Sequence, residues 1–350
     1  MNLLSTIITK IQVSLFPHLE QALGELTDQE KQLIEVLEII RIEEHVCHAR
    51  KFTGRPQKDR RAVARAFVAK ACLGIRDTKA LIQTLASSPH LCRICGFNHA
   101  NDVPSEATFS RAFSAFAAGD LGRVVNDALL ETFADDEVVN LCRDSTAIAA
   151  REKPLSKAEK NALKEAESER ERRLVRQQKQ ELPQMLDELP DACEWGVKKN
   201  AQGKMQAWKG YKFHTDTTAD GLVLSAVLTS ASVHDSQAAI PLCAMTHQRW
   251  VPYFELMDAA YDATEIHAFV HDRFSVPIID GNKRRGETRV FTDNQEERYK
   301  KRGAVERDYA TIKDWLGGRF VMVKGAAKVF MHLMFGVLVN NARKLVKRLR

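Results

Sequence analysis

The sequence predicts a mixed α/β protein with an all-helical N-terminal region and a sheet-containing core. Apolar residues recur at helical spacing over residues 1–135, and strand-like apolar runs alternate with helical segments over residues 136–325. A stretch rich in Lys, Arg, Glu and Gln interrupts the core at residues 151–200, and residues 326–350 have the pattern of a basic amphipathic helix. We therefore expect a helical region, a core with a charged insertion, and a C-terminal helix.

Start and stop signals define the helices of the N-terminal region. Thr27-x-x-Glu30 is the sequence of a capping box, and a helix-forming stretch from Asp59 to about residue 86 is interrupted near Gly74 and Asp77. A further helix opens after Pro104, because proline is favoured in the first turn of a helix. These segments are expected to form a small helical bundle.

The helix that follows Pro104 has two distinct faces. Phe109, Phe113 and Phe116 recur at helical spacing and are expected to face the core, which leaves Arg111 outward. Such a helix can enter a major groove of DNA, so Arg111 is a candidate DNA contact. The alternative is a bundle that only supports the core.

Alternating patterns predict the strands of the core. Residues 207–215 and 222–229 are separated by a segment that ends in Asp220-Gly221, which marks a hairpin turn. Together with residues 138–148, they are expected to form a three-stranded antiparallel meander. After these strands, residues 236–248, 262–273 and the segment around Glu306 read as helices, and residues 253–258 and 275–280 read as strands.

The charged segment differs in composition from both of its neighbours. Over residues 151–190, strong helix formers and interspersed opposite charges predict an exposed helix or a partly disordered arm. Its apolar positions are too sparse for a sustained coiled-coil seam. We interpret it as a solvated insertion after the first core strand.

Two aspartates lie in or directly after apolar runs that read as strands. Asp144 has β-branched and apolar residues on both sides, and Asp258 stands where an apolar run gives way to small residues before a helix cap. A carboxylate in a buried strand is costly unless it binds something, and sites are often built where a strand ends. Since either aspartate alone could simply cap a turn, the prediction of a site depends on a third acid.

The third acid lies in a basic segment near the C-terminus. Tyr299, Arg302, Glu306 and Lys313 follow the pattern Y-x2-R-x3-E-x6-K, inside a segment that reads as one helix. Steps of three, four and seven residues return to about the same helical face, which places one carboxylate between an arginine and a lysine. This arrangement suits an acid site that faces phosphate, although a solvated charged stripe has the same spacing.

These residues resemble the DDE transposases of bacterial insertion sequences, in the class that carries the Y-R-E-K signature. The resemblance extends from about residue 50 to the end, apart from the charged insertion. It implies a ribonuclease-H-like core in which Asp144, Asp258 and Glu306 are the catalytic, metal-binding acids and Tyr299, Arg302 and Lys313 bind DNA. The matching stretches are Asp144-Ser145-Thr146, Trp208 to His214, His234-Asp235-Ser236, Asp258 to Asp262, and Tyr299 to Lys313.

The resemblance implies metal-dependent cleavage at the ends of the element and transfer of the 3′-hydroxyl into target DNA. Two divalent ions can activate the attacking oxygen and stabilise the leaving one. Carboxylate oxygens suit Mg²⁺, for which Mn²⁺ can substitute, so two such ions are expected in the site. The alternatives are a transposase-derived DNA-binding protein and a nuclease without strand transfer. The interval from Asp258 to Glu306 is too short for the strand-rich insertion of some members, which leaves a hairpin route of cleavage open.

A basic loop precedes the segment that carries Glu306. Lys283, Arg284 and Arg285 lie between Gly281 and Gly286, and such a loop can hold a DNA backbone through sequence-independent contacts. The net charge of +6 also favours a polyanionic partner, although it does not separate DNA from RNA or an acidic membrane. The expected partners are the inverted repeats of the element and target DNA, with a homodimer formed when two ends are brought together.

The sequence predicts a soluble protein, and the resemblance implies a place in the bacterial cytoplasm, associated with the nucleoid. No N-terminal run resembles a signal peptide, and the longest apolar segment, residues 321–339, is interrupted by basic residues. The seven cysteines, an odd number, read as reduced thiols. Cys92-x2-Cys95-x3-His99 has the spacing of a partial zinc knuckle, but a four-ligand pattern is missing, so a structural zinc and an ordinary helical segment both stay open.

Overall fold

The protein is described by a computed structural model that covers residues 3–47, 58–135, 137–168, 170–199, 203–281 and 289–348. The chain divides into two compact units. One unit comprises Met1–Ala134, Thr311–Gly318 and Ala327–Arg350, and the other comprises Asp135–Ala310 and Arg319–Ala326.

The first unit is helical, and its helices begin where the sequence signals predict. The Thr27 hydroxyl accepts a hydrogen bond from the Glu30 amide, and the Glu30 carboxylate accepts one from the Thr27 amide, which confirms the capping box. Gly74, with a φ of +62°, and the capping residue Asp77 separate α4 from α5. The α-helices of this unit are α1 (Leu3–Lys10), α2 (Phe16–Leu23), α3 (Asp28–Ile40), α4 (Arg60–Cys72), α5 (Thr78–Ser87), α6 (Pro89–Ile94), α7 (Glu106–Ala118), α8 (Leu121–Phe133) and α16 (Ala326–Lys347).

Phenylalanine rings fill the centre of this helical unit. The ring of Phe67 on α4 lies 5.0 to 6.4 Å, centroid to centroid, from the rings of Phe109, Phe113 and Phe116 on α7, all in edge-to-face contact. The three α7 rings are buried and Arg111 is exposed, as predicted.

Helix α16 is buried over a longer stretch than its sequence pattern predicts. Most of the basic residues lie in its second half, but buried residues continue to Val346. Near that end, the Arg343 guanidinium donates to the Cys72 carbonyl at 3.0 Å, so even a basic residue of the second half is held by the bundle.

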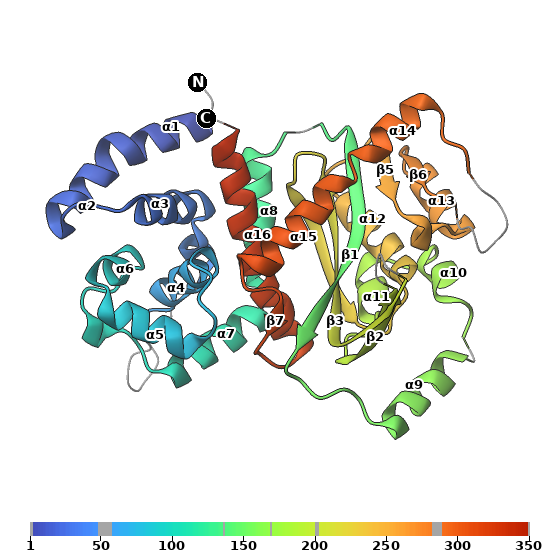
Figure 1. Ribbon diagram of the computed structural model, residues 1–350, viewed down its shortest axis with the longest axis horizontal. Helices are drawn as coiled ribbons and strands as arrows, with labels where there is room; N and C mark the ends of the chain where they lie inside the picture. Colours follow the sequence, from blue (N-terminus) through green and yellow to red (C-terminus); the bar gives the residue numbers. More distant parts are fainter. Residues whose placement is uncertain are drawn as a thin grey trace. The chain divides into compact units, whose positions relative to one another are not determined.

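The second unit is built on a seven-stranded mixed sheet (Figure 1). Strand β1 (Asn140–Ala150) pairs antiparallel with β3 (Met205–Thr218) and parallel with β5 (Phe254–Met257), and β5 pairs parallel with β6 (Val276–Ile279). Strand β4 (Val223–Ser230) pairs antiparallel with the second half of β3. The predicted meander is confirmed, and the strand order is that of the ribonuclease-H-like fold.

The charged segment is more structured than expected. It forms α9 (Lys157–Ser168), α10 (Arg173–Gln177) and α11 (Leu182–Asp187), and it leads into a strand, β2 (Glu194–Lys199), which pairs with the first half of β3. The interpretation as a solvated insertion is wrong for its second half. Leu174 of α10 and Met185 of α11 pack into an apolar cluster with α12 (Ala239–Thr246) and α13 (Thr264–His271). Helices this short need only one or two apolar anchors, which is too few to produce a visible period.

The basic segment near the C-terminus is two helices and not one. Helix α14 (Asp293–Lys300) ends two residues before α15 (Gly303–Asp314) begins. Across the break, Arg302 donates its amide to the Tyr299 carbonyl and Ala304 donates to Lys301, both bonds of the tighter i to i−3 type. Gly303 is a weak helix former, which accounts for the break. A last short strand, β7 (Phe320–Val321), was not predicted and pairs with the end of β1.

Among the described residues, no helix combines the length and the apolar character needed to cross a bilayer.

Candidate active site

Asp144 lies in the middle of β1, opposite Thr215 of β3. Its Oδ1 accepts a hydrogen bond from the Ser145 amide at 2.7 Å, and its Oδ2 accepts one from the Arg302 guanidinium at 3.0 Å. Its backbone carbonyl accepts a third, from the hydroxyl of Tyr309, at 2.6 Å. The residue is therefore held from both its side chain and its main chain.

Asp258 follows directly after the last residue of the neighbouring strand, β5, as the sequence predicts. Its Oδ1 accepts a hydrogen bond from the Ala260 amide at 2.9 Å and so caps a single 3-10 turn. Because β1 and β5 are parallel neighbours, Asp258 lies on the strand next to the one that carries Asp144.

Glu306 lies in the first turn of α15, where Arg302 joins it to Asp144. The guanidinium donates to Asp144 Oδ2 and, through its other terminal nitrogen, to Glu306 Oε1 at 3.2 Å. The Arg302 side chain is only 17 % exposed, whereas that of Glu306 is 63 % exposed. One half-buried cation thus bridges two acids that are far apart in the sequence, and the outer acid is open to solvent.

The electrostatics of the site disfavour its own negative charge. Burial, with smaller contributions from nearby Asp258 and Asp235, raises the pKa of Asp144 to about 6 against the opposing effects of Arg302 and the Ser145 amide. Burial also raises the pKa of Asp258. Burial would lower the pKa of the Arg302 guanidinium, but Asp144 and its other acidic neighbours raise it above its ordinary value. The site therefore favours an additional cation.

The donor set fits a hard divalent cation. Asp144, Asp258 and Glu306 offer carboxylate oxygens, the ligands that Mg²⁺ and Mn²⁺ prefer. In the described part of the chain, these three acids do not form a group in which one oxygen from each lies within 4.8 Å of the other two. Asp144 and Glu306 both contact the Arg302 guanidinium, and Asp258 acts on it electrostatically.

The other predicted DNA contacts have different environments. Tyr299, on α14, lies against Phe291 in a tilted contact with ring centroids 5.1 Å apart, and the Arg302 guanidinium lies 5.8 Å from the centre of the Tyr299 ring. Lys313 is in the last turn of α15. The predicted basic loop, Lys283 to Arg285, lies outside the described residues.

Two further charged residues lie at the site and were given no role from the sequence. Lys212 of β3 forms an ion pair with Asp235 at 2.9 Å. Burial would raise the pKa of Asp235, but the electrostatic effects of His214 and Lys212 and hydrogen bonds from Lys212 and Ser145 lower it below its ordinary value. Both residues belong to stretches that carry the family resemblance, so the signal was present, but their pairing depends on the fold.

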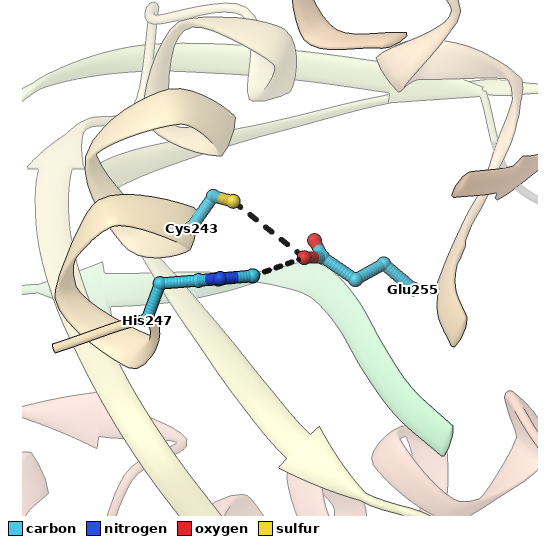
Figure 2. A group of neighbouring side chains, drawn as sticks. All are labelled: Cys243, His247 and Glu255. Carbon is cyan, nitrogen blue, oxygen red and sulfur yellow. Dashed lines mark hydrogen bonds and ion pairs between the residues drawn. The ribbon is translucent and has the colours of Figure 1, made fainter. Parts of the chain in front are cut away.

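A second polar cluster lies beneath the site, on the face of the sheet covered by α12. Glu255 of β5 accepts a hydrogen bond from His247 at 2.7 Å, and the Cys243 thiol lies 3.5 Å from the same oxygen (Figure 2). Cys243, His247 and Glu255 are the single group of three possible metal ligands found among the described residues. The other Glu255 oxygen accepts a bond from Arg143 at 2.7 Å, so both oxygens of this carboxylate already have hydrogen-bond donors.

The cysteines near residue 95 have the features of an ordinary helical segment. All seven cysteines of the chain are free. Cys92 and Cys95 are buried, and within the described residues they do not form a ligand group with His99. The nearby His90 forms hydrogen bonds through both ring nitrogens, to the Glu30 carboxylate and to the Leu23 carbonyl.

The helical unit contains a separate polar groove beside the start of α7. The groove has a volume of about 540 Å³, and none of its lining residues in the described part of the chain is acidic. Arg111 lies on its wall, where it donates to the Thr108 hydroxyl at 3.2 Å. The other polar lining residues are Lys58, Arg60, Asn101 and Ser105.

Comparison with known protein families gives two matches. The family described as Transposase DDE domain matches residues 141–341, which is more than half of the chain and includes Asp144, Asp258 and Glu306. The family described as Transposase domain (DUF772) matches residues 19–115, within the helical unit. No curated protein matches the chain significantly, and no solved structure does so either.

Proposed function

The chain belongs to the DDE transposase family, and from this premise we propose that it cuts the ends of a bacterial insertion sequence and joins them to target DNA. In the cut, a water oxygen attacks phosphorus at the element end, a new P–O bond forms, and the 3′-oxygen leaves with a proton as a free hydroxyl. In the joining step, this 3′-hydroxyl attacks a target phosphodiester, and the 3′-oxygen of the target strand leaves. Each P–O bond broken is replaced by one formed, so no external energy source is needed.

Asp144, Asp258 and Glu306 are the proposed catalytic acids and metal ligands. Members of this family generally use divalent metal ions, and we propose Mg²⁺ or Mn²⁺, with two ions per site. When bound, such ions supply charge that activates the attacking oxygen and stabilises the leaving one. The observation that carries the proposal is the contact of Arg302 with both Asp144 and Glu306, beside the strand that ends at Asp258.

Arg302, Tyr299 and Lys313 are proposed to contact DNA. Arg302 holds Asp144 and Glu306 together, and its planar guanidinium has the geometry to donate to phosphate oxygens as well. Tyr299, in tilted contact with Phe291, presents an aromatic ring beside this guanidinium. Lys313 would act as a point charge toward the backbone, as would Lys283, Arg284 and Arg285.

The test combines purified protein, Mg²⁺, a labelled DNA from the flank of the coding region, and a target plasmid. We expect joined products from the wild type and at least a 100-fold loss with Glu306→Gln, because a lost metal ligand removes several kcal/mol from transition-state stabilisation. Glu297→Gln, an exposed acid on α14, is the matched control and should retain activity. Cut ends without joining would indicate a nuclease, and retention of uncut DNA would indicate a binding protein.

The helical unit is proposed to bind the terminal inverted repeats through its polar groove. Its described lining contains Lys58, Arg60 and Arg111 and no acid, which suits a phosphate backbone. Arg111→Ala should weaken binding of end DNA and reduce the slope of log affinity against log salt by about 1 for one lost phosphate contact. An unchanged slope would remove Arg111 from the interface. Since two ends must be brought together, we propose a homodimer on end DNA, which sedimentation of the complex would test.

A further inference from the structure

Helix α15 is fastened to β1 at two points, and only one of them belongs to the residues already given a role. Arg302, just before the helix, donates to the side chain of Asp144. Tyr309, one and a half turns into the helix, donates its hydroxyl proton to the backbone carbonyl of the same aspartate at 2.6 Å. Glu306 lies between these two points, four residues after Arg302 and three before Tyr309.

The environment of Tyr309 fixes the direction of this hydroxyl. The side chain is buried, with 6 % of the residue exposed. Its oxygen accepts a hydrogen bond from the Thr215 hydroxyl at 2.9 Å, and Thr215 is the residue directly opposite Asp144 in the β1–β3 ladder. With Thr215 as donor, the single proton of Tyr309 is committed to Asp144. The bond therefore joins the helix to two strands of the sheet at the position of the aspartate.

From this geometry we infer that Tyr309 is a positioning residue that sets the separation of Asp144 and Glu306, and thereby the affinity of the site for divalent ions. The inference depends on the proposed role of those two acids as metal ligands. Arg302 alone cannot set this separation. Its contacts are both to carboxylate oxygens, which a cation would attract in its place, whereas the Tyr309 contact is to a main-chain atom and persists when the carboxylates turn toward an ion.

The test is Tyr309→Phe, which keeps the ring and removes one hydroxyl. We expect the Kd for Mn²⁺, measured by calorimetry and by electron paramagnetic resonance on DNA-free protein, to rise about three- to tenfold, the equivalent of one hydrogen bond. Binding of end DNA in EDTA should be unchanged. Tyr211→Phe is the matched control, because the buried Tyr211 hydroxyl donates to Glu152 at 2.7 Å and touches none of the three acids. It should leave the Kd for Mn²⁺ as in the wild type.

The outcomes separate this inference from the proposed function. If Asp144→Asn abolishes Mn²⁺ binding while Tyr309→Phe binds as the wild type does, Tyr309 has no positioning role. If Asp144→Asn also binds Mn²⁺ normally, the metal role of the acids is wrong. An equal rise in Kd for both tyrosine variants would show a general loss of packing and overturn the inference. Should Tyr309→Phe fail to fold, Thr215→Val removes the donor to the same hydroxyl and should raise the Kd by a smaller factor.

Discussion

Both faces of the sheet around β1 carry an arginine that pairs with two acids, but the two sets differ in burial and in hydrogen bonding. On the α12 face, Arg143 is fully buried and donates to both oxygens of Asp216 and to Glu255, all at 2.7 Å. On the α15 face, the next residue, Asp144, pairs with Arg302, which also pairs with the exposed Glu306. Neighbouring residues of a strand point to opposite faces, so one step along β1 separates the two environments.

The difference lies in how completely each set is satisfied. Asp216 also accepts a bond from Thr246, and Glu255 accepts one from His247, so every oxygen of the buried pair has a donor. At the α15 face, burial raises the pKa of Asp144 while Glu306 is left in solvent. A saturated network holds a structure together, whereas a set with excess acid and an open side is suited to bind a cation and a substrate.

The strongest test of this comparison is Arg143→Met. It leaves Asp216 and Glu255 buried without their cation, which typically costs about 3–5 kcal/mol of unfolding free energy. Arg302→Met, on the other face, should lower the unfolding free energy clearly less, because the Glu306 side chain can be solvated when its partner is removed. Urea unfolding of both variants measures the difference. Equal losses would mean that the two faces are equally structural.

Asp144→Asn should raise the free energy of unfolding, whereas the two arginine variants should lower it. The pKa of Asp144 is raised by burial from 3.8 to about 6 in the folded protein, so the ionised form is disfavoured by folding. The wild type therefore loses stability as the pH rises from about 4 through 6. In EDTA, we expect the variant to be more stable by roughly 3 kcal/mol at pH 8 and by about half of that at pH 5.

Thermal unfolding at the two pH values measures this effect, and Asp216→Asn is its control. Burial raises the pKa of Asp216 as well, but this carboxylate faces the fully buried Arg143. Removing its charge leaves a buried cation with one partner fewer and should destabilise the protein at pH 8. Mg²⁺ should stabilise the wild type and not Asp144→Asn, because a ligand stabilises only the state that binds it. A less stable Asp144→Asn at pH 8 would contradict the proposed excess of acid on the α15 face.

The residues of the α15 face could be predicted from the sequence, but those of the α12 face could not. The three acids and Arg302 were named from strand ends and helical spacing, because those signals are local. Arg143 stands next to Asp144 and drew no prediction, since its partners depend on the β1–β3 register that places Arg143 opposite Asp216. The Lys212–Asp235 pair and the Tyr309 contact also join segments far apart in the sequence.

The misjudged elements have a similar cause. A single glycine, Gly303, divides the segment that was read as one helix, and its effect appears only in the i to i−3 hydrogen bonds of the backbone. Strand β2 and helices α10 and α11 carry too few apolar residues for a period to be read. Strand β2 is ordered because it pairs with β3, and α10 and α11 are ordered because they pack on the apolar surface of α12.

The smallest expected effect concerns Cys243, which decides whether the cluster beneath the site is structural or a metal centre. The distance of 2.7 Å between His247 and Glu255 is that of a hydrogen bond, and the second Glu255 oxygen is held by Arg143. An ion would have to displace both contacts. We therefore expect Cys243→Ala to cost only about 1 kcal/mol, the scale of one weak contact and a small void. Elemental analysis should find the same zinc content, close to zero, in the wild type and in Cys243→Ala. One zinc per wild-type chain, lost in Cys243→Ala together with several kcal/mol of stability, would make the α12 face a metal site and reverse the comparison.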